Sequence, residues 1–220
     1  MRPWETLASA DSPDGRFELR RRGERDFLIT VAGRVLMNSA ARRSEEALAR
    51  GVCARLLQRP SPRVLIGGLG MGLTLRAALG ALPGEARVTV AELNPVIVDW
   101  CRGPLAGLNA RALEDARVEV AIEDVAEVIR AARARRFDAI ALDLYEGPSG
   151  GDDGDLPFYG RRALAETRDA LVTGGVFGVW AESPDPGFEK RLRAAGFTFE
   201  RSRPGRGGLR HAVYIAVRGR

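Results

Sequence analysis

Residues 63–95 read RVLIGGLGMGLTLRAALGALPGEARVTVAELNP, and the fold follows from this stretch. It begins with a short apolar run, 64–66, of the kind that forms a strand buried on both faces. Glycines, a helix-forming segment and a second apolar run, 88–91, come next, and Glu92 follows directly. The order strand, glycine turn, helix, strand and acid is typical of βαβ units that bind nucleotides.

The glycine turn and the acid each have a physical use in such a unit. A backbone without Cβ atoms can approach a bound nucleoside closely. The candidates for that role are Gly67, Gly68, Gly70 and Gly72. Glu92 follows Gly72 by 20 positions, the spacing at which a carboxylate meets ribose hydroxyls. The alternative is a tight turn between strand and helix with an incidental glutamate.

The composition is that of a soluble globular enzyme. With 220 residues, of which 45% are hydrophobic and 29% charged, the chain fits one domain with a small appendage. No apolar run approaches the roughly 18 residues of a membrane span, and residues 1–15 do not resemble a secretory signal. Cys53 and Cys101 lie far apart and belong to no metal-binding pattern. We therefore expect free thiols, a cytoplasmic location and no metal site.

The net charge of +5 raises the question of a nucleic-acid partner. Of the 34 basic residues only Lys190 is a lysine, and the arginines are scattered along the chain. This pattern indicates a compositional bias more than a nucleic-acid surface. An acidic partner for the basic segments 20–25 and 201–210 stays open as an alternative.

The N-terminal part precedes the nucleotide-binding pattern and differs from it. Residues 1–15 are polar and are expected to form a loop. Alternating apolar and polar residues then predict a β-hairpin and a further short strand, at 17–21, 27–31 and 34–38. We therefore expect a small antiparallel unit over 1–40 and an α/β domain over 41–220.

Strand and helix patterns alternate through the rest of the chain. Further strands are expected at 117–122, 137–142, 176–180, 197–201 and 212–217. The last two are joined by a basic loop with no room for a helix, so they should pair as an antiparallel hairpin. The glycines at 174 and 175 should end the helix 158–171 before the strand at 176. The prediction is a doubly wound, mostly parallel, seven-stranded α/β sheet of the Rossmann-like kind.

Acids stand at three strand ends of this predicted sheet, where ligands of open α/β folds bind. Besides Glu92, Asp124 could accept a hydrogen bond from an adenine amino group, with the Val125 backbone beside it, or could simply cap a helix. Asp143 follows the most apolar strand and is positioned to orient and deprotonate a nucleophile. Its alternative role is to cap the following loop.

The segment 144–157 is rich in glycine and aspartate and is long for such a connection, which is typical of lids and binding loops. Glu146, with Tyr145 beside it, is the candidate there for contact with the substrate. His211 is the only histidine, and we interpret it as structural rather than catalytic.

Several motifs together resemble the spermidine synthases, a family of aminopropyltransferases, over about residues 17–200. The motifs are VLIGGLGMG, VTVAELNP, VEVAIEDV, FDAIALDLYEGP and LPFYGRRALAETRDALVTGGVF, preceded by the small β unit. The resemblance implies a class I methyltransferase fold and a donor that is decarboxylated S-adenosylmethionine or S-adenosylmethionine itself. It also implies a small amine as acceptor and a homodimer.

By position, the resemblance makes 67–72 the glycine loop, Glu92 the ribose acid, Asp124 the adenine-side acid and Asp143 the acid that activates the attacking amine. Glu146 falls where the family usually has a second aspartate. Two features depart from the family pattern. Gly70 stands where an aspartate is usual, and residues 45–50 replace a segment of the Tyr-His-Glu type.

The sequence therefore predicts a transferase that moves an aminopropyl group from decarboxylated S-adenosylmethionine to an amine. Two alternatives stay open, because the fold alone does not select the chemistry. One is an S-adenosylmethionine-dependent methyltransferase, and the other is a protein that binds an adenosyl ligand without turnover.

Overall fold

The computed structural model describes residues 2–13, 15–132, 136–148, 158–205 and 211–219. Its N-terminal part is an antiparallel sheet in the order β1-β2-β3-β4. The strands are β1 (Glu5–Ser12), β2 (Gly15–Arg22), β3 (Asp26–Val31) and β4 (Arg34–Asn38). The three predicted strands are present. The loop predicted for residues 1–15 is wrong, because residues 5–12 pair along β2 and this pairing outweighs their polar composition.

The main sheet has seven strands in the order β10-β11-β9-β8-β5-β6-β7. The five from β7 to β9 in this order are parallel, and β11 is antiparallel to both of its neighbours, β9 and β10. The strands are β5 (Arg63–Gly67), β6 (Arg87–Ala91), β7 (Val118–Ala121), β8 (Phe137–Leu142), β9 (Leu171–Ala181), β10 (Phe197–Ser202) and β11 (Ala212–Arg218). The predicted α/β class, the seven strands and the final antiparallel hairpin are confirmed.

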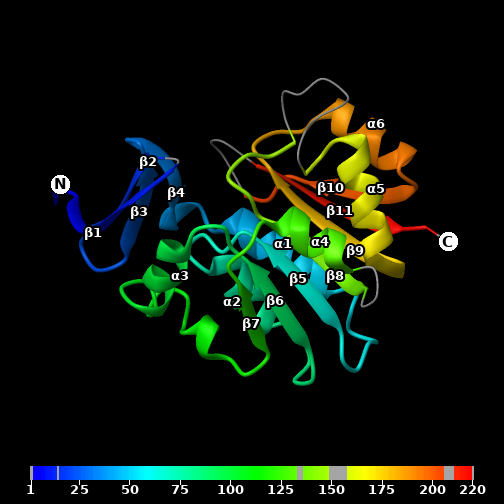
Figure 1. Cartoon of the computed structure of the whole chain (residues 1–220), viewed down its shortest axis with the longest axis horizontal. Coiled ribbons are helices and arrows are strands. Elements are labelled where there is room, and N and C mark those ends of the chain that lie inside the picture. The colour runs from blue at the N-terminus through cyan, green and yellow to red at the C-terminus, as the bar shows by residue number, and fades with distance from the viewer. Residues whose placement is uncertain (1, 14, 133–135, 149–157, 206–210, 220) are drawn as a thin grey trace.

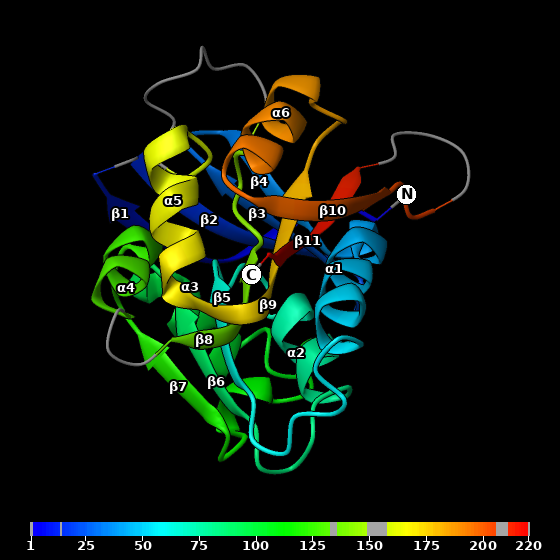
Figure 2. The same ribbon diagram turned by 90° about the vertical axis from the view of Figure 1, so that its right-hand side faces the viewer.

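Helices cover both faces of this sheet, with α4, α5 and α6 on one side and α1 and α2 on the other (Figures 1 and 2). None of the helices in the described part of the chain is long and apolar enough to cross a membrane. The helices are α1 (Arg43–Cys53), α2 (Leu73–Leu79), α3 (Pro95–Arg102), α4 (Val125–Ala131), α5 (Arg161–Ala170) and α6 (Pro186–Ala194), with 3₁₀ turns at η1 (Ser39–Ala41) and η2 (Ala112–Glu114).

Strand β5 shows why the sequence folds into three layers. Its side chains alternate between two apolar cores, so that Val64 and Ile66 face one core and Leu65 faces the other. The first core also contains Phe17 and Leu19 from β2, and the N-terminal sheet therefore packs against the α/β part of the molecule. The predicted division of the chain at residue 40 stays a prediction.

One predicted boundary is wrong. Gly174 and Gly175 do not end a helix, since α5 stops at Ala170 and both glycines lie inside β9. The pairing of β8 with β9 shifts its register at this point. A Cβ atom on Gly175 would lie 2.7 Å from the carbonyl oxygen of Val172, so the glycine permits the irregular backbone there.

Candidate active site

A cavity of about 800 Å³ opens at the carboxyl ends of β5, β6 and β8. Its walls come from the glycine loop, from the segments after these strands and from β4 of the N-terminal sheet. Seven carboxylates line it: Glu45, Glu92, Glu123, Asp124, Asp143, Glu146 and Glu182. Among the described lining residues there is no arginine or lysine. The described part of the chain contains no group of three His, Cys, Asp or Glu side chains arranged to hold a metal ion.

Glu92 is buried at the end of β6 and is held by two backbone amides. The Leu69 N–H donates to Oε2 and the Asn94 N–H donates to Oε1, both at 2.9 Å. These bonds fix the carboxylate against the glycine loop. Each oxygen retains acceptor capacity toward the cavity, as a ribose-binding acid requires.

The four predicted glycines divide into two pairs. Gly68 and Gly70 line the cavity, and both have the positive φ that favours glycine, 86° and 52°. A Cβ atom on Gly68 would collide with the Asp143 carbonyl oxygen. Gly67 and Gly72 do not line the cavity but permit close packing. A Cβ atom on Gly67 would press on Val125 and Leu142, and one on Gly72 would press on Asn109.

Asp124 and Val125 both line the cavity. Asp124 is also the N-cap of α4, because its Oδ1 accepts the Ala126 N–H at 2.9 Å. The capping alternative therefore describes a real contact, and it leaves the second carboxylate oxygen for a ligand. The adenine-side role stays a prediction.

Asp143 directly follows β8 and lies beside the glycine loop, with its backbone amide donating to the Gly67 carbonyl at 2.9 Å. The Thr74 hydroxyl donates to Asp143 Oδ2. Burial, together with the negative charge of Glu45, raises the pKa of Asp143 to about 7, against the opposing effect of the Thr74 bond. A carboxylate with this pKa is a much better proton acceptor near neutral pH than an ordinary aspartate.

Glu146 and Tyr145 line the cavity next to Asp143, and both side chains are exposed to solvent. Tyr159 was not predicted as a site residue, although it also lines the cavity. It is 3% exposed, and its hydroxyl has no hydrogen-bond partner among the described residues. Burial and the charges of Asp143 and Glu146 raise the pKa of Tyr159, which therefore stays neutral and can bond a polar ligand.

Glu45, Trp180 and His211 were also not predicted as site residues, although all three line the cavity. Glu45 is 6% exposed, accepts the Ser44 hydroxyl at 2.8 Å and has its pKa raised chiefly by burial. The rings of Trp180 and His211 stack with 4.8 Å between centroids, and the Nδ1 atom of His211 has no partner among the described residues. The interpretation of His211 as structural did not predict its place in the cavity wall.

Neither cysteine is suited to nucleophilic chemistry. Both are free and buried, and burial raises the pKa of Cys53 to about 11 and of Cys101 to about 12. Cys101 instead supports the glycine loop, since its thiol donates to the Gly70 carbonyl at 3.3 Å.

A parallel sheet with a glycine loop, a buried acid at the end of the next strand and further acids at its carboxyl edge is typical of nucleoside-binding α/β proteins. Residues 52–189 match the model of the spermine/spermidine synthase domain family. The chain belongs to this family.

Individual relatives differ in the group that their names say they transfer. A polyamine aminopropyltransferase of Mycobacterium tuberculosis is 35% identical over 127 residues, which are 55% of this chain and 23% of that protein. A putrescine N-methyltransferase of Nicotiana attenuata is 36% identical over 127 residues, 56% of this chain and 32% of that protein. The match thus spans less than a third of the length of either relative.

The fold itself is shared over nearly the whole chain. Spermidine synthase from Thermotoga maritima superposes with a TM-score of 0.78 at 21% identity, covering 97% of this chain and 73% of the other. This similarity extends to the N-terminal sheet and confirms the fold that the sequence motifs implied.

Proposed function

We propose that this protein transfers an aminopropyl group from decarboxylated S-adenosylmethionine to a small amine. The observation that carries the proposal is the charge of the cavity. Seven acids and no arginine or lysine line it among the described residues, although the whole chain carries a net charge of +5. Such a cavity favours cations, and both the sulfonium donor without its carboxylate and a protonated amine are cations.

The predicted roles of the site residues fit this chemistry. Glu92 would accept the ribose hydroxyls, Asp124 and Val125 would face the adenine, and Gly68 with Gly70 would let the donor lie close to the loop. Asp143, between the glycine loop and Thr74, would face the sulfonium.

Asp143 would take the proton that the acceptor ammonium must lose before it reacts. The freed nitrogen lone pair forms a bond to the propyl carbon, and the carbon–sulfur bond breaks with its electron pair going to sulfur. The leaving thioether is neutral and needs no acid. Tyr145, Glu146 and the unpartnered Tyr159 hydroxyl would hold the amine, so that the reacting atoms are aligned.

The second candidate is methyl transfer from S-adenosylmethionine to an amine. The similarity to putrescine N-methyltransferases, equal in extent to the similarity to aminopropyltransferases, favours it. The acidic cavity argues against it, because the carboxylate of S-adenosylmethionine would lie among like charges.

Two further predictions, the cytoplasmic location and the homodimer, remain part of the proposal.

Calorimetric titration with methylthioadenosine, decarboxylated S-adenosylmethionine and S-adenosylmethionine tests the proposal. We expect all three to bind and the decarboxylated donor to bind more tightly than S-adenosylmethionine. A preference for S-adenosylmethionine would assign the protein to methyl transfer. Binding of none of the three would refute the adenosyl-ligand site altogether.

A further inference from the structure

Met37 reaches from the N-terminal sheet onto the glycine loop. It lies on β4 and lines the cavity together with Gly70. The backbone N–H of Met71 donates to its sulfur atom, with 3.2 Å between N and Sδ. A thioether is a weak acceptor, so this amide is held by a weaker bond than an oxygen would give.

The position of Met37 depends on the glycine at residue 70. A Cβ atom on Gly70 would lie 2.7 Å from Met37 Cε and 2.8 Å from Met37 Sδ, closer than such atoms approach in proteins. Met37 therefore packs directly on the backbone of the loop, at the position where a side chain of residue 70 would otherwise project. Residues 37 and 70 together therefore set the shape of this cavity wall, which a bound S-adenosylmethionine-type ligand would contact.

The loop offers few free hydrogen-bond donors to an anionic ligand. Four of its amides already donate inside the protein, those of Gly68, Leu69, Met71 and Gly72. Of these four, only the Met71 amide has an acceptor from the N-terminal sheet. Removal of that acceptor would free a donor directly after the cavity-lining Gly70 without breaking a bond within the α/β sheet.

We propose that Met37 is a specificity-determining residue that selects the decarboxylated donor. This inference rests on the proposed function. The Met37 sulfur accepts the Met71 N–H, and the Met37 side chain fills the space above Gly70. A carboxylate on the ligand would therefore find neither a free N–H to bind nor space at this position. The acids of the cavity repel that carboxylate, and Met37 denies it the nearest compensating contact.

The test compares dissociation constants of S-adenosylmethionine, its decarboxylated form and methylthioadenosine in folded variants. In Met37→Ala the dissociation constant of S-adenosylmethionine divided by that of the decarboxylated form should fall about tenfold. This is the factor that one hydrogen bond to a charged group supplies. Methylthioadenosine, which has no carboxylate, should bind within about threefold of wild type if only this contact changes. Leu36→Ala, at the neighbouring cavity position, is the matched control and should leave the ratio unchanged.

Met37→Leu provides a second variant that keeps the bulk and loses the sulfur acceptor, so its ratio should fall by a smaller factor. It carries the test if Met37→Ala does not fold. An unchanged ratio in the folded Met37 variants, with methylthioadenosine still bound, would overturn the inference and leave the proposed function intact. Wild-type protein that binds no adenosyl ligand, or that prefers S-adenosylmethionine, would overturn both.

Discussion

Asp143 must be ionised to accept a proton, and its pKa of about 7 sets the pH at which that happens. The rate should therefore fall as the pH drops below about 7 and level off above it, in contrast to an enzyme with an ordinary aspartate. Asp143→Asn should lower the rate by roughly 10²–10⁴ while the affinity for methylthioadenosine changes little. Steady-state rates across pH check this prediction. An active variant with the wild-type profile would show that the proton leaves by another route.

The same pKa makes a prediction for stability. The folded pKa of Asp143 lies above its ordinary value of 3.8, so ionisation of this group destabilises the fold as the pH rises through about 7. Asp143→Asn removes the buried charge. It should therefore raise the melting temperature above pH 7 relative to wild type, and the gain should shrink as the pH falls toward 3.8. Thermal unfolding of both proteins at several pH values tests this, and a gain that does not depend on pH would contradict it.

Glu92 should be the main determinant of nucleoside affinity. Glu92→Gln keeps the shape but removes the charge that ribose hydroxyls would bind, and hydrogen bonds to charged groups contribute about 1.5–3 kcal/mol each. We expect methylthioadenosine to bind at least about tenfold more weakly. Glu123→Gln, an exposed acid that lines the same cavity, is the control. Equal affinity in wild type and a folded Glu92→Gln variant would remove Glu92 from the site.

Only part of the candidate site could be predicted from the sequence. Glu92 and Asp143 directly follow β6 and β8, Asp124 comes shortly after the end of β7, and the topology of a parallel sheet alone brings all three to one edge. The unpredicted residues come from several elements: Glu45 from α1, Met37 from the edge strand β4, Trp180 from β9 and the others from loops. No local pattern records that these elements converge, because their convergence depends on how the N-terminal sheet and α1 pack.

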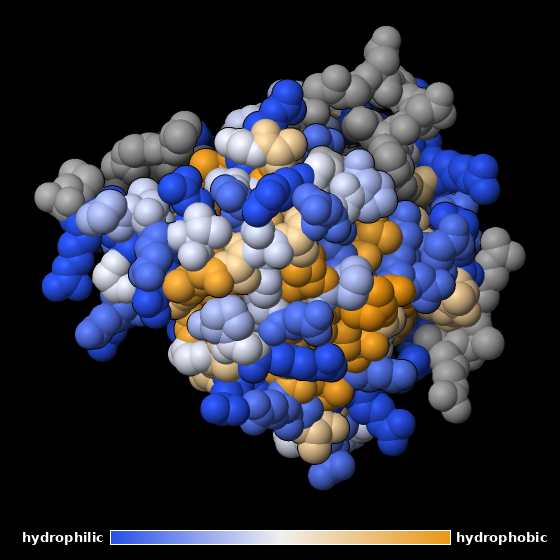
Figure 3. Space-filling model, turned by 60° about the vertical axis from the view of Figure 1, so that its left-hand side comes forward, coloured by the Kyte–Doolittle hydropathy of each residue, from blue (hydrophilic) through white to orange (hydrophobic). Residues whose placement is uncertain are grey.

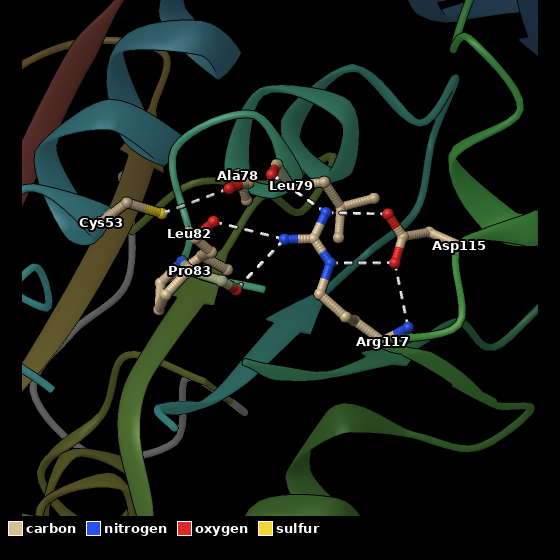
Figure 4. A network of polar contacts seen from close by, with 7 residues as sticks. All are labelled: Cys53, Ala78, Leu79, Leu82, Pro83, Asp115 and Arg117. Carbon is tan, nitrogen blue, oxygen red and sulfur yellow. Dashed lines mark hydrogen bonds and ion pairs between the residues drawn. The ribbon is translucent and has the colours of Figure 1, made fainter. Parts of the chain in front are cut away.

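At the scale of elements, Arg117 ties β7 to the end of α2 (Figure 4). Its guanidinium donates to the carbonyls of Leu79, Leu82 and Pro83 and forms two bonds with Asp115. The Leu79 carbonyl lies at the C-terminal end of α2, where backbone carbonyls have no partner within the helix. Leu82 and Pro83 lie in the segment just after the helix. The contact therefore stabilises both the helix end and the start of β7.

Arg117→Met should lower the free energy of unfolding by about 2–3 kcal/mol, because the Leu79 and Leu82 carbonyls lose the guanidinium donor and Asp115 loses its ion pair. Arg111→Met, which removes an exposed ion pair with Glu114, should change it by less than about 1 kcal/mol. Chemical denaturation measures both. Equal effects of the two substitutions would show that the Arg117 network contributes no more than a surface pair.

Arg117 also holds the pKa of Asp115 down to about 2 through its hydrogen bonds. Because this pKa is lowered from 3.8, the stabilisation is present above pH 3.8 and is lost as the pH falls toward 2. The stability difference between wild type and Asp115→Asn should therefore shrink over that range. A difference that stays constant in acid would contradict the assignment.

The elements of the main sheet were predictable because buried strands and glycine turns leave local signals. The exceptions are the first half of β9 in this sheet and β1 in the N-terminal sheet. Residues 5–12 form a strand only because β2 lies beside them, and Gly174 and Gly175 enter β9 only because the pairing with β8 tolerates an irregular register. Both depend on a neighbouring strand that the local sequence does not specify.

The whole molecule combines a positive net charge of +5 with an acidic cavity. Figure 3 shows hydrophilic side chains over much of one face, with apolar side chains reaching the surface in groups between them. Val35, Leu93 and Tyr145 are among the exposed apolar residues, and they also line the cavity.

The homodimer that the family resemblance implies remains a prediction, which sedimentation of the purified protein tests.

The contrast in charge predicts how ligand binding responds to salt. A diamine should bind in the cavity through its positive charges, and its affinity should fall as salt screens the acids. Methylthioadenosine is neutral and should bind with little dependence on salt. Glu182→Gln should weaken diamine binding and leave methylthioadenosine binding unchanged. Titrations at low and high ionic strength check this, and diamine affinity that does not depend on salt would contradict an acidic acceptor site.

The most direct measurement is mass spectrometry of the product formed from a diamine when both donors are supplied together. The account predicts a diamine extended by one aminopropyl group, with methylthioadenosine released, and loss of this product in Asp143→Asn. A diamine extended by one methyl group would contradict the account and assign the protein to methyl transfer. Unchanged diamine, from protein that binds methylthioadenosine, would show that the site binds adenosyl ligands without transferring a group.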